Sequence, residues 1–366
     1  MQRGMDWLDG LVRRRRALVL GAWIVLLLAS LPFSLRQTER LTSGGFDSPG
    51  SSSAAVDAAL ADFPGVERDR LAVLLAARPG GDAGRVRAEI RRIDRVAARL
   101  PHLELSERAE AAALRRAGAE SVTLVPLAVT GSVNEVSDVT VDLREELGVG
   151  EGPRGGVEPY LVGQQALWAG MQQLAKEDLA AAEAVGFPIV LLVLLAVFGS
   201  LAAAALPLAL GATSVMVTGG AIFFLSRATD MSVFVTNLAS MIGIGVAVDY
   251  SLFVLARYRE EVRAGRPPEE ARRVAMRTSG LAVAFSGVTV IIALAGLFLV
   301  NSTTMRSMAM GAIVVVAVSV LGAATLLPAL IGVLGHRARD RGRLDALLAR
   351  GLRRLAGRRG DGRGGR

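Results

Sequence analysis

The residue in this sequence best placed to do chemistry is Asp249, the only acidic side chain within any of the long apolar runs. It belongs to the stretch GIGVAVDYSLFVLARYREE, residues 243–261, in an apolar segment that begins near residue 232. A carboxylate at membrane depth costs about 2.5–3.5 kcal/mol on insertion scales, so such residues usually mark proton or substrate pathways. A proton loaded and released by Asp249 would couple proton entry to movement of the surrounding helices. Alternatively, Asp249 lies about 10 Å from the end of its helix and is partly hydrated near the cytoplasmic interface.

Three hydroxyl side chains are candidates to extend a proton path from Asp249. Tyr250 follows directly, and adjacent residues of a helix point to different neighbours, so its phenol either bonds another carboxylate or a water chain, or simply packs. Ser286 and Thr289 lie in a later apolar run, where they either relay protons or, like most membrane Ser and Thr, bond their own helix backbone. We therefore predict a proton relay of Asp249, Tyr250, Ser286 and Thr289, with ordinary packing as the alternative.

Small residues lie on the same stretch as Asp249. Gly243, Gly245 and Ala247 are spread around more than one face and would let neighbouring helices approach closely. They favour a central position for this helix, although membrane helices also tolerate glycine without such a role.

Composition places the chain among membrane proteins and argues against several kinds of site. Of 366 residues, 52% are hydrophobic and 5% aromatic, and the net charge of +8 comes almost entirely from Arg. The Arg clusters flank apolar runs of membrane-spanning length, which fits membrane topology better than nucleic-acid binding. There is no Cys, and His102 and His336 are the only histidines, so we expect no disulfide and no metal site. Nucleotide-binding and hydrolase motifs do not occur, so we expect a non-enzyme without cofactors.

Six apolar runs are long enough to cross about 30 Å of hydrocarbon as helices. They occupy residues 17–35, 185–201, 206–226, 232–256, 280–300 and 306–334, and we interpret the first as an uncleaved helix rather than a signal peptide. If the N-terminus is inside, the Arg clusters at 13–16, 257–277 and 337–366 all fall on one side, as the positive-inside rule requires. We therefore predict a multi-pass protein of the inner (plasma) membrane with both termini in the cytoplasm. Arg257, Arg259, Glu260 and Glu261 are expected to anchor a helix end at the cytoplasmic surface.

Residues 36–183 have frequent charges and no membrane-length apolar run, which predicts an extracytoplasmic domain. It opens with a Gly- and Ser-rich linker at 44–53. Strands are expected at 70–77, 121–129 and 157–163, and helices at 84–100 and 134–147, with 103–117 unassigned. This alternation resembles the split β-α-β unit of ferredoxin-like α+β domains.

The predicted domain organisation has four parts. A basic N-terminus and the first transmembrane helix occupy 1–35, the water-facing domain 36–183, helices two to six 184–335, and a basic cytoplasmic tail 336–366. In the tail, the leucines between 344 and 355 fall on one face of a basic helix, which either lies on an anionic membrane surface or links to a further segment.

Taken in order, several stretches resemble the MmpL-like branch of the resistance–nodulation–division (RND) transporters. AALADFPG (58–65) is similar to the start of the family's porter region, and FGSLAAAALPLALG (198–211) to its second–third helix hairpin. GIGVAVDYSLFVLARYREE is similar to the fourth-helix signature with its Asp-Tyr pair. AFSGVTVIIALAGL (284–297) and LLPAL (326–330) resemble the fifth and sixth helices. Nearly the whole chain is similar to the N-terminal half of such transporters, the MMPL domain.

The resemblance implies export of lipids or other hydrophobic molecules across the inner membrane, driven by the proton gradient. Asp249 and Tyr250 would be the proton site and residues 36–183 a porter module. Full family members carry two halves whose Asp-Tyr pairs face each other, and this chain has one. The implied partners are therefore a second copy or a second transporter half, together with membrane lipids and a hydrophobic substrate. The alternatives are a non-transporting membrane scaffold or secretion-accessory protein on the same fold, or an inactive half.

Overall fold

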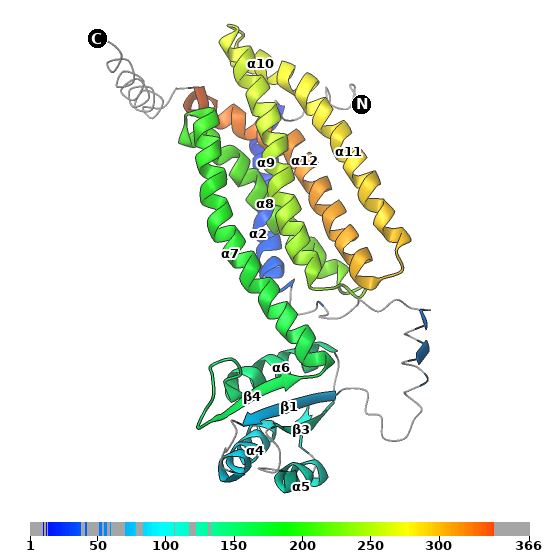
Figure 1. Ribbon diagram of the computed structural model, residues 1–366. Coiled ribbons are helices and arrows are strands. Elements are labelled where there is room, and N and C mark those ends of the chain that lie inside the picture. Colours follow the sequence, from blue (N-terminus) through cyan, green and yellow to red (C-terminus); the bar gives the residue numbers. More distant parts are fainter. Residues whose placement is uncertain are drawn as a thin grey trace, which may run out of the picture.

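One long helix, α7, joins a sheet domain to a helical bundle in the computed structural model (Figure 1). The structure describes residues 10, 12, 14–37, 41, 51–52, 55–56, 59, 70–77, 83–105, 107–116, 122–130 and 133–339. Almost all of the expected linker at 44–53, and the predicted amphipathic face at 344–355, lie outside these residues.

The sheet domain alternates strands with helices along the chain. Its elements are, in order, β1 (Arg70–Ala77), α4 (Ala83–Ala97), β2 (Leu103–Glu104), α5 (Glu107–Arg116), β3 (Val122–Val129), α6 (Val133–Leu147) and β4 (Val157–Val162). The order in the sheet is β2-β3-β1-β4, and each neighbouring pair is antiparallel. The connections through α4 and α6 therefore each pass over one antiparallel strand, whereas α5 joins the neighbouring strands β2 and β3.

The core of this domain lies between one face of the sheet and two helices, α4 and α6. Strand β1 alternates, so that Leu71, Val73 and Leu75 point into the core. Helices contribute residues at helical spacing, which are Val86, Ile90, Ile93 and Val96 from α4 and Val139, Leu143 and Leu147 from α6. The predicted helical pattern of α4 is thus confirmed.

Residues 103–117, left unassigned from the sequence, form a very short strand followed by an extra helix. Strand β2 has only two residues, and it pairs Leu103 with Val129 and Glu104 with Ala128. The ten residues of α5 then follow. This stretch carries Glu, Ala, Leu and Arg, which are strong helix formers, and hardly any β-branched residue that would extend the strand.

Six helices of the described residues are long and apolar enough to cross a membrane. They lie within α2 (Arg16–Leu35), α7 (Gln164–Phe198), α8 (Leu201–Leu225), α9 (Phe234–Arg263), the stretch Pro268–Leu299 with α11 (Leu281–Ala295), and α12 (Thr303–Arg339). Helix α9 packs against both α8 and α12, while α11 packs mainly on α12. The central position expected for the helix that carries Asp249 follows from these contacts.

Helices α7 and α8 both begin earlier than the hydropathy pattern predicted. Helix α7 begins at Gln164, directly after the sheet, because residues 164–183 are mostly Ala, Leu, Gln and Glu, which favour a helix. It ends at Gly199 in the left-handed conformation, with φ of 64°. Helix α8 then begins at Leu201 rather than near 206, so the turn between the two helices is very short.

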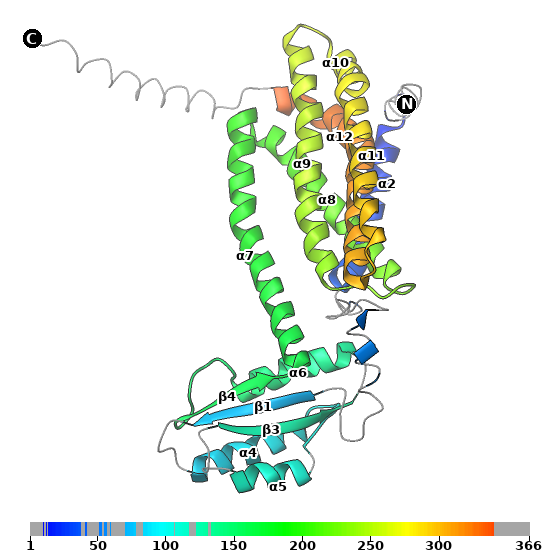
Figure 2. The same ribbon diagram turned by 45° about the vertical axis from the view of Figure 1, so that its right-hand side comes forward.

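The hydrophilic segment 257–279, which its many charges predict to be a loop between two membrane helices, is instead mostly helical. Helix α9 continues to Arg263, and after a turn at Gly265 the chain forms α10 (Pro268–Ala275) and a π-helical turn, η2 (Met276–Gly280), that leads into α11. This Arg-rich α9–α10 turn lies at the end of the bundle away from the sheet domain, and Figure 2 shows α7 spanning the distance between the two ends.

Candidate functional site

Asp249 lies on the outer surface of the bundle. It belongs to an exposed stripe of α9 with Met241, Gly245 and Phe253, four residues apart and therefore on one helical face. Met241 is 66% and Phe253 58% exposed. Within the part of the chain that the structure describes, the Asp249 carboxylate has no hydrogen-bond or ion-pair partner. The Asp249 carboxylate is therefore accessible to lipid or to another protein segment that contacts this stripe.

Tyr250 points the opposite way, into the bundle. Its side chain is only 5% exposed, and its hydroxyl lies 3.6 Å from the position that a Cβ atom would take on Gly287 of α11. Gly287 itself packs tightly on α12, since the same Cβ would come within 2.2 Å of Val320. The Asp-Tyr pair therefore divides its two groups, with the carboxylate outside and the phenol reaching α11.

Ser286 and Thr289 are exposed on α11, on both sides of the residue that Tyr250 approaches. The Thr289 hydroxyl donates to the backbone carbonyl of Phe285 at 3.0 Å, which is the local bonding usual for membrane threonines. No hydrogen bond joins Asp249 to either residue within the described chain. The structure brings Tyr250 next to this part of α11, whereas Asp249 stays on its own helix surface.

The three small residues near Asp249 occupy different environments. Gly243 and Ala247 are buried, and a Cβ on Gly243 would meet Val315 of α12 at 2.4 Å. Gly245 does not take the packing position expected of it in this chain, because nothing lies within 4 Å of a Cβ built there. It lies on the exposed stripe with Asp249, where a close approach would have to come from another molecule or segment.

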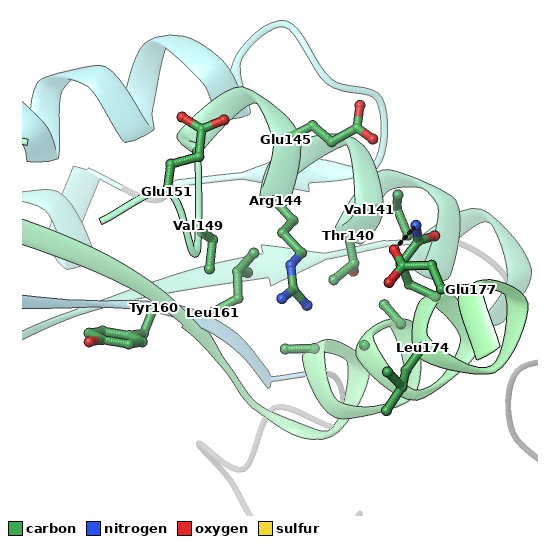
Figure 3. Close-up of a pocket in the computed structure, with 15 residues that line it drawn as sticks. Thr140, Val141, Arg144, Glu145, Val149, Glu151, Tyr160, Leu161, Leu174 and Glu177 are labelled. Carbon is green, nitrogen blue, oxygen red and sulfur yellow. Dashed lines mark hydrogen bonds between the residues drawn. The ribbon is translucent and has the colours of Figure 1, made fainter. Parts of the chain in front are cut away.

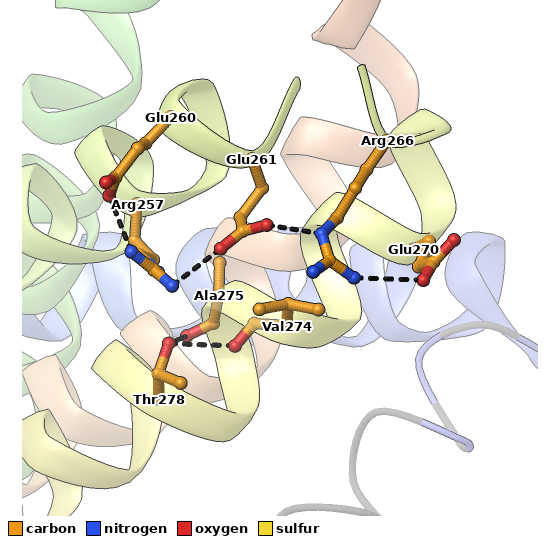
Figure 4. Close-up of polar contacts among 8 residues, drawn as sticks. All are labelled: Arg257, Glu260, Glu261, Arg266, Glu270, Val274, Ala275 and Thr278. Atoms are coloured by element: carbon orange, nitrogen blue, oxygen red, sulfur yellow. Dashed lines mark hydrogen bonds and ion pairs between the residues drawn. The ribbon is translucent and has the colours of Figure 1, made fainter. Parts of the chain in front are cut away.

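The Arg-rich end of the bundle holds an ion-pair network that sequence reasoning indicated only as a helix-end anchor (Figure 4). Glu261, with a side chain only 7% exposed, accepts from Arg257 and from Arg266, each at 2.6 Å. Arg257 also pairs with Glu260 at 2.7 Å, and Arg266 with Glu270 at 3.1 Å. The i, i+4 spacing of Arg257 and Glu261 was a detectable signal, but the bridge to Arg266 depends on the turn between α9 and α10.

The chemistry available at these sites is proton uptake, polar contact and ion pairing. Within the described residues, no group of three or more His, Asp or Glu side chains is placed to hold a metal ion. The Asp249 carboxylate could take up a proton, since it lies 14 residues before the end of α9 at Arg263 and has no bonded partner within the described residues.

Comparison with known proteins identifies the family of this chain. The MMPL family model matches residues 50–359. The mycolic acid-containing lipids exporter MmpL11 of Mycolicibacterium smegmatis is 44% identical over 341 residues, covering 91% of this chain and 35% of that protein. The heme uptake protein MmpL11 of Mycobacterium tuberculosis is 42% identical over 339 residues, again covering 91% of this chain and 35% of that protein. The chain thus spans about a third of the length of these curated relatives.

Solved structures show the same fold in a distant protein. The hedgehog release protein Disp from the water bear Hypsibius dujardini has a TM-score of 0.63 at 14% identity, covering 91% of this chain and 50% of that protein. Together with the six apolar helices, the sequence match makes this chain a multi-pass membrane protein. Because the family model spans most of the sequence and the relatives match nearly all of it, the chain belongs to the MMPL family, within the MmpL-like RND transporters.

Proposed function

We propose that this chain acts as one half of an exporter that moves lipids or other hydrophobic molecules across the inner membrane, driven by the proton gradient. The observation that carries the proposal is Asp249, whose carboxylate lies on the exposed stripe of a membrane-length helix and has no partner among the described residues. Left against hydrocarbon, such a charge costs about 2.5–3.5 kcal/mol on insertion scales. Protonation of the carboxylate removes this cost, and a polar partner reduces it. We therefore expect Asp249 to be protonated, to contact a polar partner, or to do both in turn.

The coupling step follows from the two charge states of Asp249. When a proton from the outside binds, the stripe becomes uncharged and tolerates an apolar neighbour. When the proton leaves toward the cytoplasm, the carboxylate again requires a polar surrounding. Each charge moved through the membrane field is worth about 2.3 kcal/mol per 100 mV, and this energy biases two arrangements of α9 against its neighbour. Tyr250, which reaches α11 near Ser286 and Thr289, would sense the same change from inside the bundle.

The neighbour that covers the stripe is, in this proposal, a second transporter half or a second copy of the chain. Gly245 supports this choice, because it leaves the stripe open to close approach beside Asp249. Exposed Ser286 and Thr289 on α11 would add polar groups to the same interface. The relatives' greater length is consistent with a second half being present in them.

The sheet domain would be the porter module that passes substrate outward. Its strand order, in which the connections through α4 and α6 each pass over one antiparallel strand, supports the ferredoxin-like assignment. The lipid class is supported by the name of the M. smegmatis relative. Seven arginines between 257 and 279 lie at the end of the bundle away from this domain, which supports a cytoplasmic Arg-rich end and an extracytoplasmic sheet domain.

The test uses the full chain, with any co-purifying partner, in proteoliposomes with an imposed proton gradient. The readout is movement of a fluorescently labelled phospholipid, with and without the gradient. We expect Asp249→Asn to abolish the gradient-dependent part, and Asp230→Asn, in the exposed turn before α9, to leave it unchanged. Full gradient-dependent movement in Asp249→Asn would refute the proposal. The alternative of a non-transporting scaffold instead predicts that cells carrying Asp249→Asn behave like native cells.

A further inference from the structure

A pocket lies in the sheet domain at the point where α7 leaves it for the membrane (Figure 3). It is bounded by α6, the turn that follows α6, strand β4 and the first turns of α7. Its volume of about 450 Å³ falls in the range of small-molecule sites. Sequence reasoning did not single out any of its residues.

Small residues of α7 create this space. Ala166, Ala169 and Gly170 face α6 and line the pocket, so the two helices approach without filling it. A Cβ atom on Gly170 would lie 3.4 Å from the Nη1 atom of Arg144, the side chain that α6 directs between them. Glycine at this position therefore leaves room for a guanidinium group and for a ligand beside it.

Arg144 is the one cationic side chain among the residues that line this pocket, and it is unpaired within the described chain. Three carboxylates also line it, but two have partners of their own, since Glu151 pairs with Arg154 at 2.6 Å and Glu177 accepts from Gln173 at 2.8 Å. Figure 3 shows Glu145 pointing away from Arg144, whose guanidinium reaches into the middle of the pocket. A guanidinium with five donors and no acceptor of its own suits a carboxylate or phosphate.

Part of the remaining wall is apolar and leads toward the membrane, beside the polar side chains of Thr140 and Gln173. Val149, Leu161 and Leu174 line the pocket, and Leu174 is also 57% exposed. The membrane span of α7 begins at Ala180, six residues after Leu174, which is about 9 Å along a helix. The pocket therefore lies close to the membrane surface on the side of the sheet domain, and the exposed Leu174 lies between the pocket and that surface.

We propose that this pocket binds the anionic head group of a membrane amphiphile, with Arg144 contacting the carboxylate or phosphate and the apolar residues Val149, Leu161 and Leu174 contacting the start of its chain. The inference deepens the lipid export proposed above and rests on it for its biological role. Binding itself is measurable without transport, so the two can fail separately.

The experiment uses the purified full chain in non-ionic detergent and a photoactivatable analogue of palmitate. Labelled peptides are identified by mass spectrometry after illumination. We expect labelling of α6 and the first turns of α7, and about a tenfold or greater loss of apparent affinity in Arg144→Gln, because a hydrogen bond to a charged group is lost. Arg144→Lys, which keeps the charge, should retain most of the labelling. Arg87→Gln removes an exposed charge from α4 of the same domain and should change nothing.

Volume is tested separately from charge. Gly170→Leu keeps Arg144 but fills the pocket, and we expect it to reduce labelling as strongly as Arg144→Gln. Thermal unfolding of each variant confirms that the domain is intact. The proposal is overturned if the matching fatty alcohol labels the same peptides equally well, or if Arg144→Gln and Gly170→Leu label like the native chain. Displacement of the probe by millimolar inorganic phosphate alone would instead identify a site for soluble anions. Asp249→Asn should label normally, so a failed export proposal would leave this result standing.

Discussion

Alanine at Gly243 should destabilise the bundle, whereas alanine at Gly245, two residues later on the same helix, should not. A Cβ on Gly243 would lie 2.4 Å from a methyl carbon of Val315 in α12 and 3.1 Å from one of Val215 in α8. Valine in a helix has essentially one side-chain rotamer, so neither methyl group can turn away. The clash is relieved only if α9 moves away from α8 and α12 together. At Gly245 the same methyl group meets nothing within 4 Å.

The magnitude follows from two opposing effects. Overpacking a well-filled interior costs about 1–3 kcal/mol. Alanine is favoured over glycine inside a helix by about 1 kcal/mol, and this gain applies equally at both positions. The difference between the two variants therefore isolates the steric cost. We expect Gly245→Ala to be at least as stable as the native chain, and Gly243→Ala to lie about 1–3 kcal/mol below Gly245→Ala.

Equilibrium unfolding in mixed micelles with increasing SDS, followed by circular dichroism, measures this difference directly. Binding of a purified partner half, or self-association, should be recorded for both variants in parallel. Equal unfolding free energies for Gly243→Ala and Gly245→Ala would refute the reasoning, because they would mean that α9 is not held close to α12 at Gly243. A loss of association confined to Gly245→Ala would agree with a neighbour packed on the exposed stripe.

Two further predictions concern polar groups outside the apolar core. Glu261→Gln should lower the unfolding free energy by about 1–2 kcal/mol, less than for a fully buried pair because Arg266 reaches solvent, and should speed amide exchange near the α9–α10 turn. Its control Glu270→Gln, at the exposed end of the network, should stay within about 0.5 kcal/mol, and equal losses in both would contradict the central role of Glu261. The pKa of the Tyr160 phenol is raised, first by its hydrogen bond with Glu158 and then by desolvation and by the negative charge of Glu158. The contribution of this pair to folding stability is therefore present at neutral pH and is lost as the pH rises through the pKa of Tyr160 in the folded protein. Glu158→Gln should lower the pKa of Tyr160 in a phenolate absorbance titration, and an unchanged midpoint would refute the pairing.

Local patterns in the sequence were enough to predict most elements of the fold. The apolar spacing of α4 identifies its buried face, because the other side of this helix meets water, and the continuous apolar run at 71–77 predicts the buried strand β1. The six membrane runs follow from length and hydropathy alone. Elements that depend on pairing with another strand, or that are helical without an apolar pattern, were less predictable. Strand β2 has only two residues and exists through its pairing with β3, and α7 extends into the sheet domain because its polar first half is helical without being apolar.

The candidate sites differ in the same way: a site marked by residue type could be predicted from the sequence, whereas a site made by contacts between distant segments could not. Asp249 was found because a lone carboxylate in an apolar run is conspicuous by type. Arg144 was missed because an arginine on a soluble helix is ordinary, and its significance depends on Gly170 lying opposite it on another helix. The bridge from Glu261 to Arg266 was missed for a related reason, since the turn at Gly265 brings the two side chains together.

The orientation of α9 is the step that hydropathy could not supply. In a soluble helix the apolar stripe marks the inside, but lipid is as apolar as leucine, so a membrane helix carries no such mark. Gly243 and Gly245 look equivalent in the sequence, yet a Cβ atom on Gly243 would meet two valines, whereas one on Gly245 would meet nothing within 4 Å among the described residues. Because Asp249 is four residues after Gly245, it shares the open face, and the proposal that its carboxylate meets a proton or a neighbouring chain rests on that placement.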